Sequence, residues 1–503
     1  MCKAQGGFKR SFKVPNAFNN STKTVFETIV GNYIVAGIVY DTLNGYYTNR
    51  LTLIGLNSQG QQQWTKKYGN VKFQYLDNIF ISKWFYKQGN YLYHAGCVLD
   101  SNNYQLGVLI KFDFNGDTIW QKRYYDLSGI DVILQQVVGS VDGGFLISGL
   151  SQNSNDNSTT ALIIKTDANG NELWRKKIHK SIPDTQDAKV ILQDSTTKKI
   201  VTIGYQYIGN SQSWYNAPNL LILDSLGNKL HQLNYSNTEC NLTDIIQTKD
   251  KKFIVIGNEY NGTLAGSVKA HKSYAFKFDI NNPTTPIWSL RFDKTASGNS
   301  FYSIKDLANE DLIISGYLDS TQENNLFLNV SNRLTRINKN GVVVWNKYYN
   351  YKAINSNTVV QNVQSMLSLN KTADGGFISA IEITYNNPNK FFVVKYDSTG
   401  CDSSAYYCQT VGINELKIKS DELKIYPQPT NEFLEISFLS DDFLNNKYIT
   451  VNISNALGQI VKQTILITKQ TTQLNIKELL GGVYFLQVFN KEKLIATQKI
   501  IKE

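Results

Sequence analysis

The chain is poor in the residues that build metal sites and covalent frameworks. Its 503 residues include 5 cysteines, 4 histidines, 8 prolines and 2 methionines. Five cysteines are too few for a disulfide-dense scaffold, and four histidines leave little material for a metal centre. The longest apolar run, residues 479–489, is interrupted by two glycines and a glutamine, so no transmembrane helix is expected.

Residues that favour β-strands are abundant instead. Hydrophobic residues make up 42% of the chain, and 30 tyrosines and 24 phenylalanines stand beside many β-branched residues. This composition favours strands over helices and excludes general disorder.

The net charge of +10 lies before residue 421, because residues 421–503 hold nine lysines and nine acidic residues. Basic residues recur after a tryptophan in four of the repeats, at 64–68, 120–124, 174–178 and 345–348, and so form no single stripe that could follow a nucleic-acid backbone. Basic residues of this kind typically mark exposed edge strands. We therefore expect no nucleic-acid partner.

One pattern repeats through the first 400 residues: an apolar strand, then Asp or Asn, two residues, Gly, three residues and Trp. Clear copies occupy residues 57–64, 113–120 and 167–174. A second motif, a turn followed by a short apolar strand ending in Gly, keeps the same step. Each unit thus holds four strand-like stretches joined by hairpin turns. The repeat anchors, 54 to 59 residues apart, are Asn57, Asp113, Asp167, Asp224, Asp279, Asn338 and Asp397.

Seven four-stranded units of this length predict an all-β fold, a seven-bladed β-propeller over residues 1–408. A β-solenoid is the main competitor, although its coils are usually shorter. The seventh unit lacks a Trp strand, and residues 7–13 resemble the missing one, so we expect them to close the last blade. Cys401 and Cys408 are a candidate disulfide, whereas Cys97 and Cys240 are expected to be free or buried.

After a linker at 409–422 the repeat is lost. Residues 423–503 read as seven short alternating strands, which predicts a small immunoglobulin-like β-sandwich. The segments 426–429, 455–458, 480–484 and 499–502 resemble the type A C-terminal sorting domain of the type IX (Por) secretion system of Bacteroidetes. An ordinary accessory domain is the alternative.

This resemblance implies a type IX machinery partner, a secreted or outer-membrane surface location, and removal of the sorting domain on export. It also implies that Pro427 and Pro429 open the first strand, and that Gly482 and Tyr484 begin the penultimate one. The residues it assigns to the sorting signal are Pro427, Pro429, Gly458, Gly481, Gly482, Tyr484, Lys499 and Lys502. Gln428 stands where the family usually has Asn.

Such cargo carries a signal peptide, and the first residues, Met-Cys-Lys-Ala-Gln-Gly, lack its basic and apolar regions. We expect a leader that is encoded upstream of Met1 or already removed. Cys2 is a candidate for lipid attachment.

No catalytic constellation, cofactor motif or metal-ligand spacing is found, so no enzyme, metal or cofactor is expected. The four histidines fall in different repeats. Asp77, Asp131 and Asp187 are possible cation ligands at a channel mouth, but turn capping explains such residues better.

The Asp-x-x-Gly-x-x-x-Trp spacing resembles the tryptophan-docking motif of quinoprotein dehydrogenase propellers. That resemblance implies a structural role, locking one blade on the next. The adjacent cysteine pair common at that family's quinone site is absent, so a quinoprotein-like enzyme stays an alternative only. The implied blade-locking residues are Trp64, Trp120, Trp174, Trp288 and Trp345.

A binding function is favoured. Loops of about 10–16 residues are expected between the second and third strands of each unit, all on one face. Their aromatic rings suit the apolar faces of sugars, and their amides suit sugar hydroxyls. A protein ligand or a surface adhesin scaffold remains open, as does a face without function. The candidate ligand-binding residues are Tyr46, Tyr47, Tyr104, Trp214, Tyr215 and Tyr260.

Overall fold

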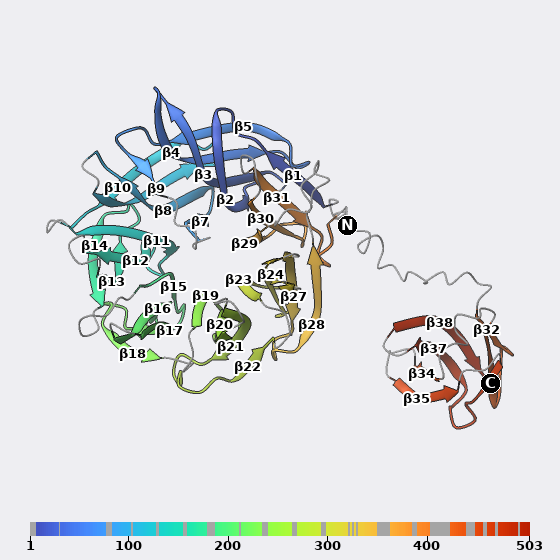
Figure 1. Cartoon of the computed structure of the whole chain (residues 1–503). Coiled ribbons are helices and arrows are strands. Elements are labelled where there is room, and N and C mark those ends of the chain that lie inside the picture. The colour runs from blue at the N-terminus through green and yellow to red at the C-terminus, as the bar shows by residue number, and fades with distance from the viewer. Residues whose placement is uncertain are drawn as a thin grey trace. The chain divides into compact units, whose positions relative to one another are not determined.

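The chain divides into two compact units, Met1–Ala405 and Tyr406–Glu503 (Figure 1). The computed structural model describes residues 7–29, 31–76, 83–101, 104–126, 130–153, 158–178, 187–210, 213–233, 240–263, 269–292, 298–319, 322–323, 326–327, 330–349, 363–384, 390–402, 423–438, 448–455, 460–467, 471–490 and 493–503. Strands are the regular elements of these ranges, and within them we find no helix that could cross a membrane.

The first unit is a β-propeller, in which antiparallel sheets follow one another around a ring (Figure 1). Its first three sheets in chain order contain β2 (Ala17–Glu27), β3 (Tyr33–Leu43), β4 (Tyr46–Leu56) and β5 (Gln62–Tyr68); β6 (Gln74–Tyr75), β7 (Phe85–Gln88), β8 (Tyr91–Leu99), β9 (Gln105–Asp113) and β10 (Thr118–Tyr124); and β11 (Asp131–Gly139), β12 (Phe145–Gln152), β13 (Thr159–Thr166) and β14 (Glu172–Ile178).

Three further sheets continue the ring. They contain β15 (Val190–Gln193), β16 (Ile200–Asn210), β17 (Ser213–Leu223) and β18 (Lys229–Leu233); β19 (Cys240–Gln247), β20 (Phe253–Thr263), β21 (Lys269–Phe278) and β22 (Trp288–Arg291); and β23 (Gly298–Asp306), β24 (Leu312–Asp319), β27 (Val330–Ile337) and β28 (Val343–Tyr349). A two-stranded ribbon of β25 (Gln322–Glu323) and β26 (Leu326–Phe327) is inserted between β24 and β27.

The last sheet of the ring combines the two ends of the unit. It contains β29 (Val363–Lys371), β30 (Phe377–Thr384) and β31 (Phe391–Tyr396), with β1 (Phe8–Phe12) as its outer strand. β1 runs antiparallel to β31, with Phe8 opposite Lys395 and Phe12 opposite Phe391. The sheet thus joins residues separated by almost 400 positions and leaves β31 with a partner on both sides.

The repeated Asx residues shape the turns between the third and fourth strands. The Asp113 carboxylate accepts the backbone amides of Asn115 at 2.9 Å and Asp117 at 2.8 Å. Gly116 supplies the left-handed conformation that this turn needs, with φ at +80°. Equivalent amide contacts recur at Asn57, Asp167, Asp224, Asn338 and Asp397.

The expectation of loops of 10–16 residues between second and third strands is wrong for the first sheet, whereas ten residues separate β24 from β27. β3 and β4 are joined by Asn44 and Gly45 alone, at φ of 53° and 82°. Asn-Gly favours a two-residue hairpin turn, so the strands continue almost to the tip. Tyr46 and Tyr47 therefore lie in β4, Trp214 and Tyr215 in β17, and Tyr260 in β20.

A recurring ion pair ties the third strand of a sheet to the turn between its first and second strands. Lys165 Nζ lies 2.8 Å from Asp142 Oδ1, and Lys277 Nζ lies 2.7 Å from Asp250 Oδ2. The same arrangement joins Arg336 to Asp311 and Lys395 to Asp374. Both lysine side chains of the first two pairs are buried, so each carboxylate compensates a charge that would be costly alone.

The hydrophobic core lies between neighbouring sheets. Ile163 of β13, for example, packs in one cluster with Ile191 of β15 and Ile200 of β16. Ile254 of β20 and Ile304 of β23 share another cluster in the same way. Each sheet is therefore stabilised by the sheets on both sides, which is how a ring of small sheets buries its apolar faces.

The second unit has two sheets. One contains β32 (Leu423–Tyr426), β33 (Phe433–Phe438) and β36 (Thr471–Asn475), and the other β34 (Tyr448–Ser454), β35 (Ile460–Ile467), β37 (Gly482–Asn490) and β38 (Lys493–Lys502). Leu434 and Ile436 of the first sheet share one buried cluster with Val451, Leu486 and Ile500 of the second. The unit therefore has a hydrophobic core of its own.

Candidate functional site

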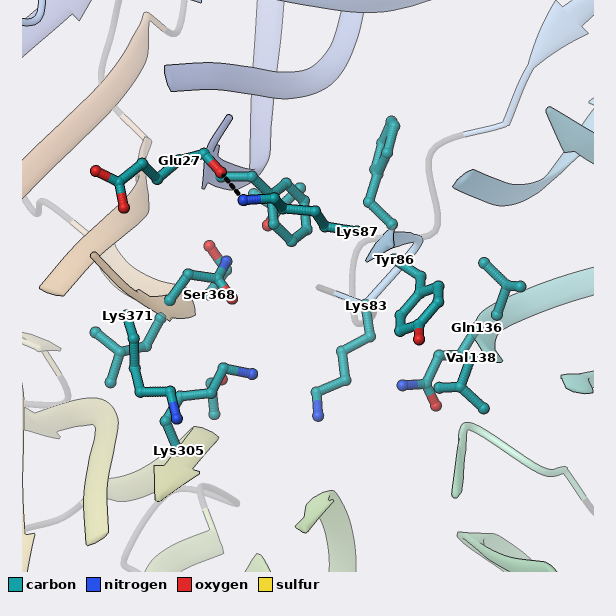
Figure 2. A pocket seen from close by; sticks show the side chains of 16 residues that line it. Glu27, Lys83, Tyr86, Lys87, Gln136, Val138, Lys305, Ser368 and Lys371 are labelled. Carbon is teal, nitrogen blue, oxygen red and sulfur yellow. Dashed lines mark hydrogen bonds between the residues drawn. The ribbon is translucent and has the colours of Figure 1, made fainter. Parts of the chain in front are cut away.

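A basic pocket lies where the first strands of several sheets face the centre of the ring. It has a volume of about 350 Å³ and is lined from β2, β7, β11, β23 and β29 and by Lys83, which precedes β7. Lys83, Lys87, Lys305 and Lys371 face it, together with a single acidic residue, Glu27 (Figure 2).

Two of the four lysines pair with carboxylates. Lys83 forms an ion pair with the buried Asp244. The Asp244 carboxylate also accepts the backbone amide of Ile304 at 2.9 Å, so this carboxylate is fixed from β23. Lys371 Nζ lies 3.0 Å from Asp306 Oδ1, in a pair whose two side chains are both exposed. The ion pair of Lys83 with the buried Asp244 is therefore less screened by solvent than the ion pair of Lys371 with the exposed Asp306.

Glu27 is held by backbone amides at the rim. Its carboxylate accepts the amide of Gly31 at 2.8 Å and that of Ala373 at 2.5 Å. Lys87 donates to the carbonyl oxygens of Glu27 and Thr28 and not to the carboxylate (Figure 2). The one acid of the lining is thus engaged in joining β2 to the turn after β29.

Lys305 differs from the other three lysines. In the part of the chain that the structure describes, its Nζ makes no hydrogen bond or ion pair. Burial, and then the neighbouring charge of Lys83, lowers the pKa of Lys305 from 10.5 to about 8, with Asp244 acting in the opposite sense. Lys83 reaches toward the open space from one side, and Lys305 and Lys371 lie on the other (Figure 2).

The remaining lining is mixed. Aromatic side chains come from Phe26, Phe85 and Tyr86, while Gln136 and Ser368 bring an amide and a hydroxyl. Such a combination of apolar surface and a few polar groups is typical of small-molecule sites. The pocket can therefore hold an anion that also has an apolar face.

The pocket lies at the end of the sheets opposite the predicted ligand face. Its lining residues gather near the carboxyl ends of the first strands, for example Lys371 in β29 and Lys305 in β23. Tyr46 and Tyr47 follow the turn between second and third strands, which in an antiparallel sheet lies at the other end. Both are exposed, at 65% and 75%, and so is Tyr104 at 49%. The side chains of Trp214, Tyr215 and Tyr260 lie outside the described residues.

Asp131 and Asp187, two of the three possible cation ligands, each accept a backbone amide. Asp131 accepts the backbone amide of Gln105 at 2.9 Å, and Asp187 accepts that of Tyr205 at 2.9 Å. Burial raises the pKa of Asp187 from 3.8 to about 6. Asp77 lies outside the described residues. No group of three or more possible metal ligands was found in the described ranges.

The histidines and cysteines described by the structure occupy unrelated places. His94 is buried among Trp84 and Phe85, and burial lowers its pKa to about 3. His231 is exposed in β18, at the position where other repeats have Trp. Cys97 and Cys240 are both free and buried. His271 has no described side chain, and His179 lies outside the described residues.

Cys401 is disulfide-bonded, whereas its predicted partner Cys408 lies outside the described residues, so the pairing stays a prediction. Cys2, proposed for lipid attachment, also lies outside them.

The tryptophans of the repeat contact the following sheet. A Cβ atom built on Gly116 would lie 2.9 Å from Trp64 Cη2, so the ring lies directly on this glycine. The hydroxyl of Tyr68 donates to the carbonyl oxygen of Gly116. Trp120, Trp174, Trp288 and Trp345 lie in the same way on Gly170, Gly227, Gly341 and Gly400.

In the second unit the expected place of the two prolines is wrong. Pro427 and Pro429 follow β32 and do not open it, because the proline-flanked turn carries the chain from β32 to β33. Gly482 is the first residue of β37 and Tyr484 its third, with the Tyr484 hydroxyl donating to Leu480 O at 2.8 Å. Lys499 and Lys502 lie in β38, and Gly458 lies outside the described residues.

The carboxyl-terminal residues connect the two sheets of this unit. Lys502 lies opposite Gly482 in β37 and also forms a parallel bridge with Thr430. Thr430 donates its amide to Ile501 O at 3.0 Å and accepts the amide of Glu503 at 3.0 Å. Gly481 lies just before β37. A Cβ atom added at this glycine would lie 3.7 Å from the backbone carbonyl carbon of Glu503. Most of the proposed sorting residues therefore surround the last strand.

Comparison with solved structures gives likenesses of fold alone. The β-propeller domain of the Trilobed protease from Pyrococcus furiosus is 8% identical, with 78% of this chain and 99% of that chain covered and a TM-score of 0.43. The Plexin A4 extracellular region is 10% identical, with 98% and 67% covered and a TM-score of 0.48. An α-L-arabinofuranosidase from Fusarium graminearum is 11% identical, with 78% and 98% covered and a TM-score of 0.38. No curated protein matches the chain.

A family model does match the second unit. Residues 424–503 match the secretion system C-terminal sorting domain. The match covers almost the whole segment in which the sorting resemblance was found, and it confirms that this segment is a sorting domain. Residues 424–503 are therefore a C-terminal sorting domain, and the protein is directed to secretion or to the cell surface.

Proposed function

We propose that this protein is a secreted or surface binding protein, exported by the type IX machinery through residues 423–503. The first unit is a seven-bladed propeller that receives the ligand, a glycan or a protein, and the second is an immunoglobulin-like sandwich that is removed or retained after export. The sorting-domain match supports the export step. The basic pocket is the observation that supports ligand binding, because five sheets contribute to one cavity.

Binding is favoured over catalysis by the way the pocket's acid and bases are used. Glu27 accepts two backbone amides, Lys83 pairs with Asp244, and Lys371 pairs with Asp306. A general acid or base needs a proton that it can exchange with a substrate, and these three groups are committed to contacts within the fold. Lys305 is not, but the other titratable groups of the described lining, Lys87 included, are hydrogen-bonded within the fold, so Lys305 has no second free acid or base beside it. The quinoprotein-like alternative rests on the tryptophan motif, whose residues here pack one sheet against the next.

The test is a binding screen with the full chain. Glycans of different charge and linkage are immobilised, and the purified protein is passed over them with and without soluble competitor. Saturable retention by one class, abolished by the soluble form of that glycan, is the expected result. Failure to retain any glycan, together with failure to capture any surface protein of the producing cell, contradicts the proposal.

The end of the first sheet that lies opposite the basic pocket supports a second candidate function, that of a surface adhesin. Phe18, 48% exposed, lies edge-on to Tyr47 with ring centroids 5.4 Å apart, and Tyr46 is exposed beside them. Exposed aromatic side chains of this kind are frequent in contact surfaces. An adhesin role predicts that changing Tyr46 and Tyr47 to Ser reduces cell or surface attachment and leaves ligand binding in the basic pocket unchanged.

A further inference from the structure

We propose that the basic pocket at the centre of the ring binds a carboxylated saccharide, with its carboxylate at Lys305 and Lys371. This inference rests on the proposed binding function and names the chemical class of its ligand. The proposed carboxylate contacts lie on β23 and β29. They include none of the aromatic residues that were expected from the sequence to bind sugar.

The charge of the pocket favours an anion, because Asp244 and Asp306 compensate Lys83 and Lys371 but no described carboxylate forms an ion pair with Lys305. Four ammonium groups face a cavity of about 350 Å³, and the one carboxylate of the lining, Glu27, already accepts two backbone amides. Lys305 lies near the ammonium groups of Lys83 and Lys371 and has no hydrogen-bonded partner among the described residues. Like charges held together in a partly desolvated cavity repel each other, and a bound anion removes that repulsion.

The rest of the lining favours a saccharide over a small inorganic anion. Phe26, Phe85 and Tyr86 offer ring faces or edges, and sugars present apolar C–H faces to such rings. Gln136 Oε1 accepts the amide of Ile191 at 2.6 Å and Asn370 Nδ2 donates to Val25 O at 2.8 Å. The Gln136 amide nitrogen, the Asn370 amide oxygen and the Ser368 hydroxyl are therefore the groups that suit sugar hydroxyls. The volume lies at the lower end of the range for small-molecule pockets, which matches one or two sugar rings.

The protonation of Lys305 should make ligand binding at this site depend on pH. The charged groups that act on Lys305 are Lys83 and Lys371, which lower its pKa, and Asp244 and Asp306, which raise it; Lys87 and Glu27 complete the charged lining. Because burial holds the pKa of free Lys305 near 8, part of the population is neutral at pH 8. A bound carboxylate favours the ammonium form and raises this pKa, so binding takes up protons at pH 8 to 9 and weakens as the pH rises above about 8.

The experiment is calorimetric titration of the full chain at pH 8 in two buffers of different ionisation enthalpy. The probes are a digalacturonate, the neutral digalactose, a sulfated digalactose and inorganic phosphate. The variants are Lys305→Gln, Lys371→Gln and, as a matched loss of one charge on the exposed surface, Lys72→Gln. Thermal unfolding of each variant shows that it is folded.

We expect the digalacturonate to bind with proton uptake, and the neutral sugar to bind at least about tenfold more weakly. Lys305→Gln should reduce digalacturonate affinity by about 10- to 100-fold and abolish proton uptake, Lys371→Gln should reduce affinity to a smaller extent, and Lys72→Gln should change neither.

Equal binding of the sulfated sugar, or tighter binding of phosphate, overturns the choice of a carboxylate. Digalacturonate binding that Lys305→Gln and Lys371→Gln leave unchanged overturns the site. Binding of neutral glycans alone overturns this inference while the proposed binding function stands. If in addition the glycan and protein screens described above give no ligand, the proposed function itself fails.

Discussion

The ring of Phe8 lies on Gly60, so closely that a Cβ atom at position 60 would lie 2.5 Å from Phe8 Cε2. Trp64 stands in the same relation to Gly116, and Trp345 to Gly400. Phe8 therefore takes the tryptophan's place in the sheet that β1 completes. The same kind of contact is found at each junction where Trp or Phe is present, and the Phe8 contact joins the last sheet of the ring, through β1, to the first sheet.

Replacing Gly60 by alanine should destabilise the propeller. Gly60 has φ at +71°, where a side chain costs about 1 kcal/mol, and its Cβ would also displace the Phe8 ring. Gly45→Ala is the matched control, because Gly45 has φ at +82° but nothing within 4 Å of a Cβ. We expect urea unfolding to give a loss of about 1 kcal/mol for Gly45→Ala and about 2 to 4 kcal/mol for Gly60→Ala. Equal losses would mean that the Phe8 contact adds nothing.

The tyrosine that follows the tryptophan motif should contribute through a single hydrogen bond. The buried Tyr124 hydroxyl donates to the Gly170 carbonyl at 2.7 Å, in the next sheet, and burial raises its pKa. Tyr124→Phe leaves that carbonyl without this donor and should lower the free energy of unfolding by about 1 to 2 kcal/mol. The neighbouring Tyr125 is 56% exposed, so Tyr125→Phe should have almost no effect in the same unfolding experiment.

The ion pairs beneath the first hairpin turns should make stability depend on pH in the acidic range. Burial alone would raise the pKa of Asp142, but the hydrogen bonds from Lys165 and Ser140 outweigh it and hold this pKa below 3.8. A carboxyl group with a lower pKa in the folded state stabilises the fold above its unfolded pKa and loses that contribution as the pH falls through the folded value.

The measurement is the free energy of unfolding between pH 6 and pH 2.5. We expect Asp142→Asn to flatten part of the decrease seen in the unchanged protein, and Lys165→Met, which removes the other partner, to flatten the same part. If the decrease keeps its slope in both variants, this pair is not among its causes.

Much of the ring could be predicted from the sequence because its determinants are local and repeated. Asp113 and Gly116 form their turn with neighbouring residues, and the two turn motifs that recur in each unit divide it into four strand-like stretches. The outer strand at residues 7–13 was recognisable because Phe8 and the basic residues after it repeat the pattern that follows each tryptophan. Local chemistry of this kind is visible in a sequence.

The pocket could not be predicted in the same way. Lys83, Lys305 and Lys371 belong to no shared motif, and only closure of the ring brings them to one cavity. Ligand contacts were predicted in aromatic loops, but the Asn44-Gly45 turn makes one such loop a tight hairpin. No shared signal marks them: Lys305 is the last residue but one of β23 and Lys371 is the last residue of β29, so Lys371 corresponds to Asp306 and not to Lys305 in the repeat.

The last strand of the sorting domain should contribute separately to the stability of the second unit and to the signal that directs export. Ile500 is fully buried in the core of this unit, whereas Lys499 is exposed beside it. Thr430 pairs with Ile501 and Glu503, so loss of residues 498–503 removes part of β38 and its bond to the other sheet. We expect this deletion to unfold the second unit and to leave the protein in the periplasm of the producing cell, with the propeller still folded because it has its own core.

Point variants then distinguish the two properties. Ile500→Asp should act like the deletion, since it places a charge in the core. Lys499→Gln combined with Lys502→Gln should leave the unit folded, as measured by resistance to protease, and should still reduce export if the basic residues are part of the signal. Fusing residues 423–503 to a carrier protein should bring the carrier to the surface, and the two-lysine variant of this fusion should do so less. Normal export of the chain that lacks residues 498–503 would show that the address lies elsewhere in the domain.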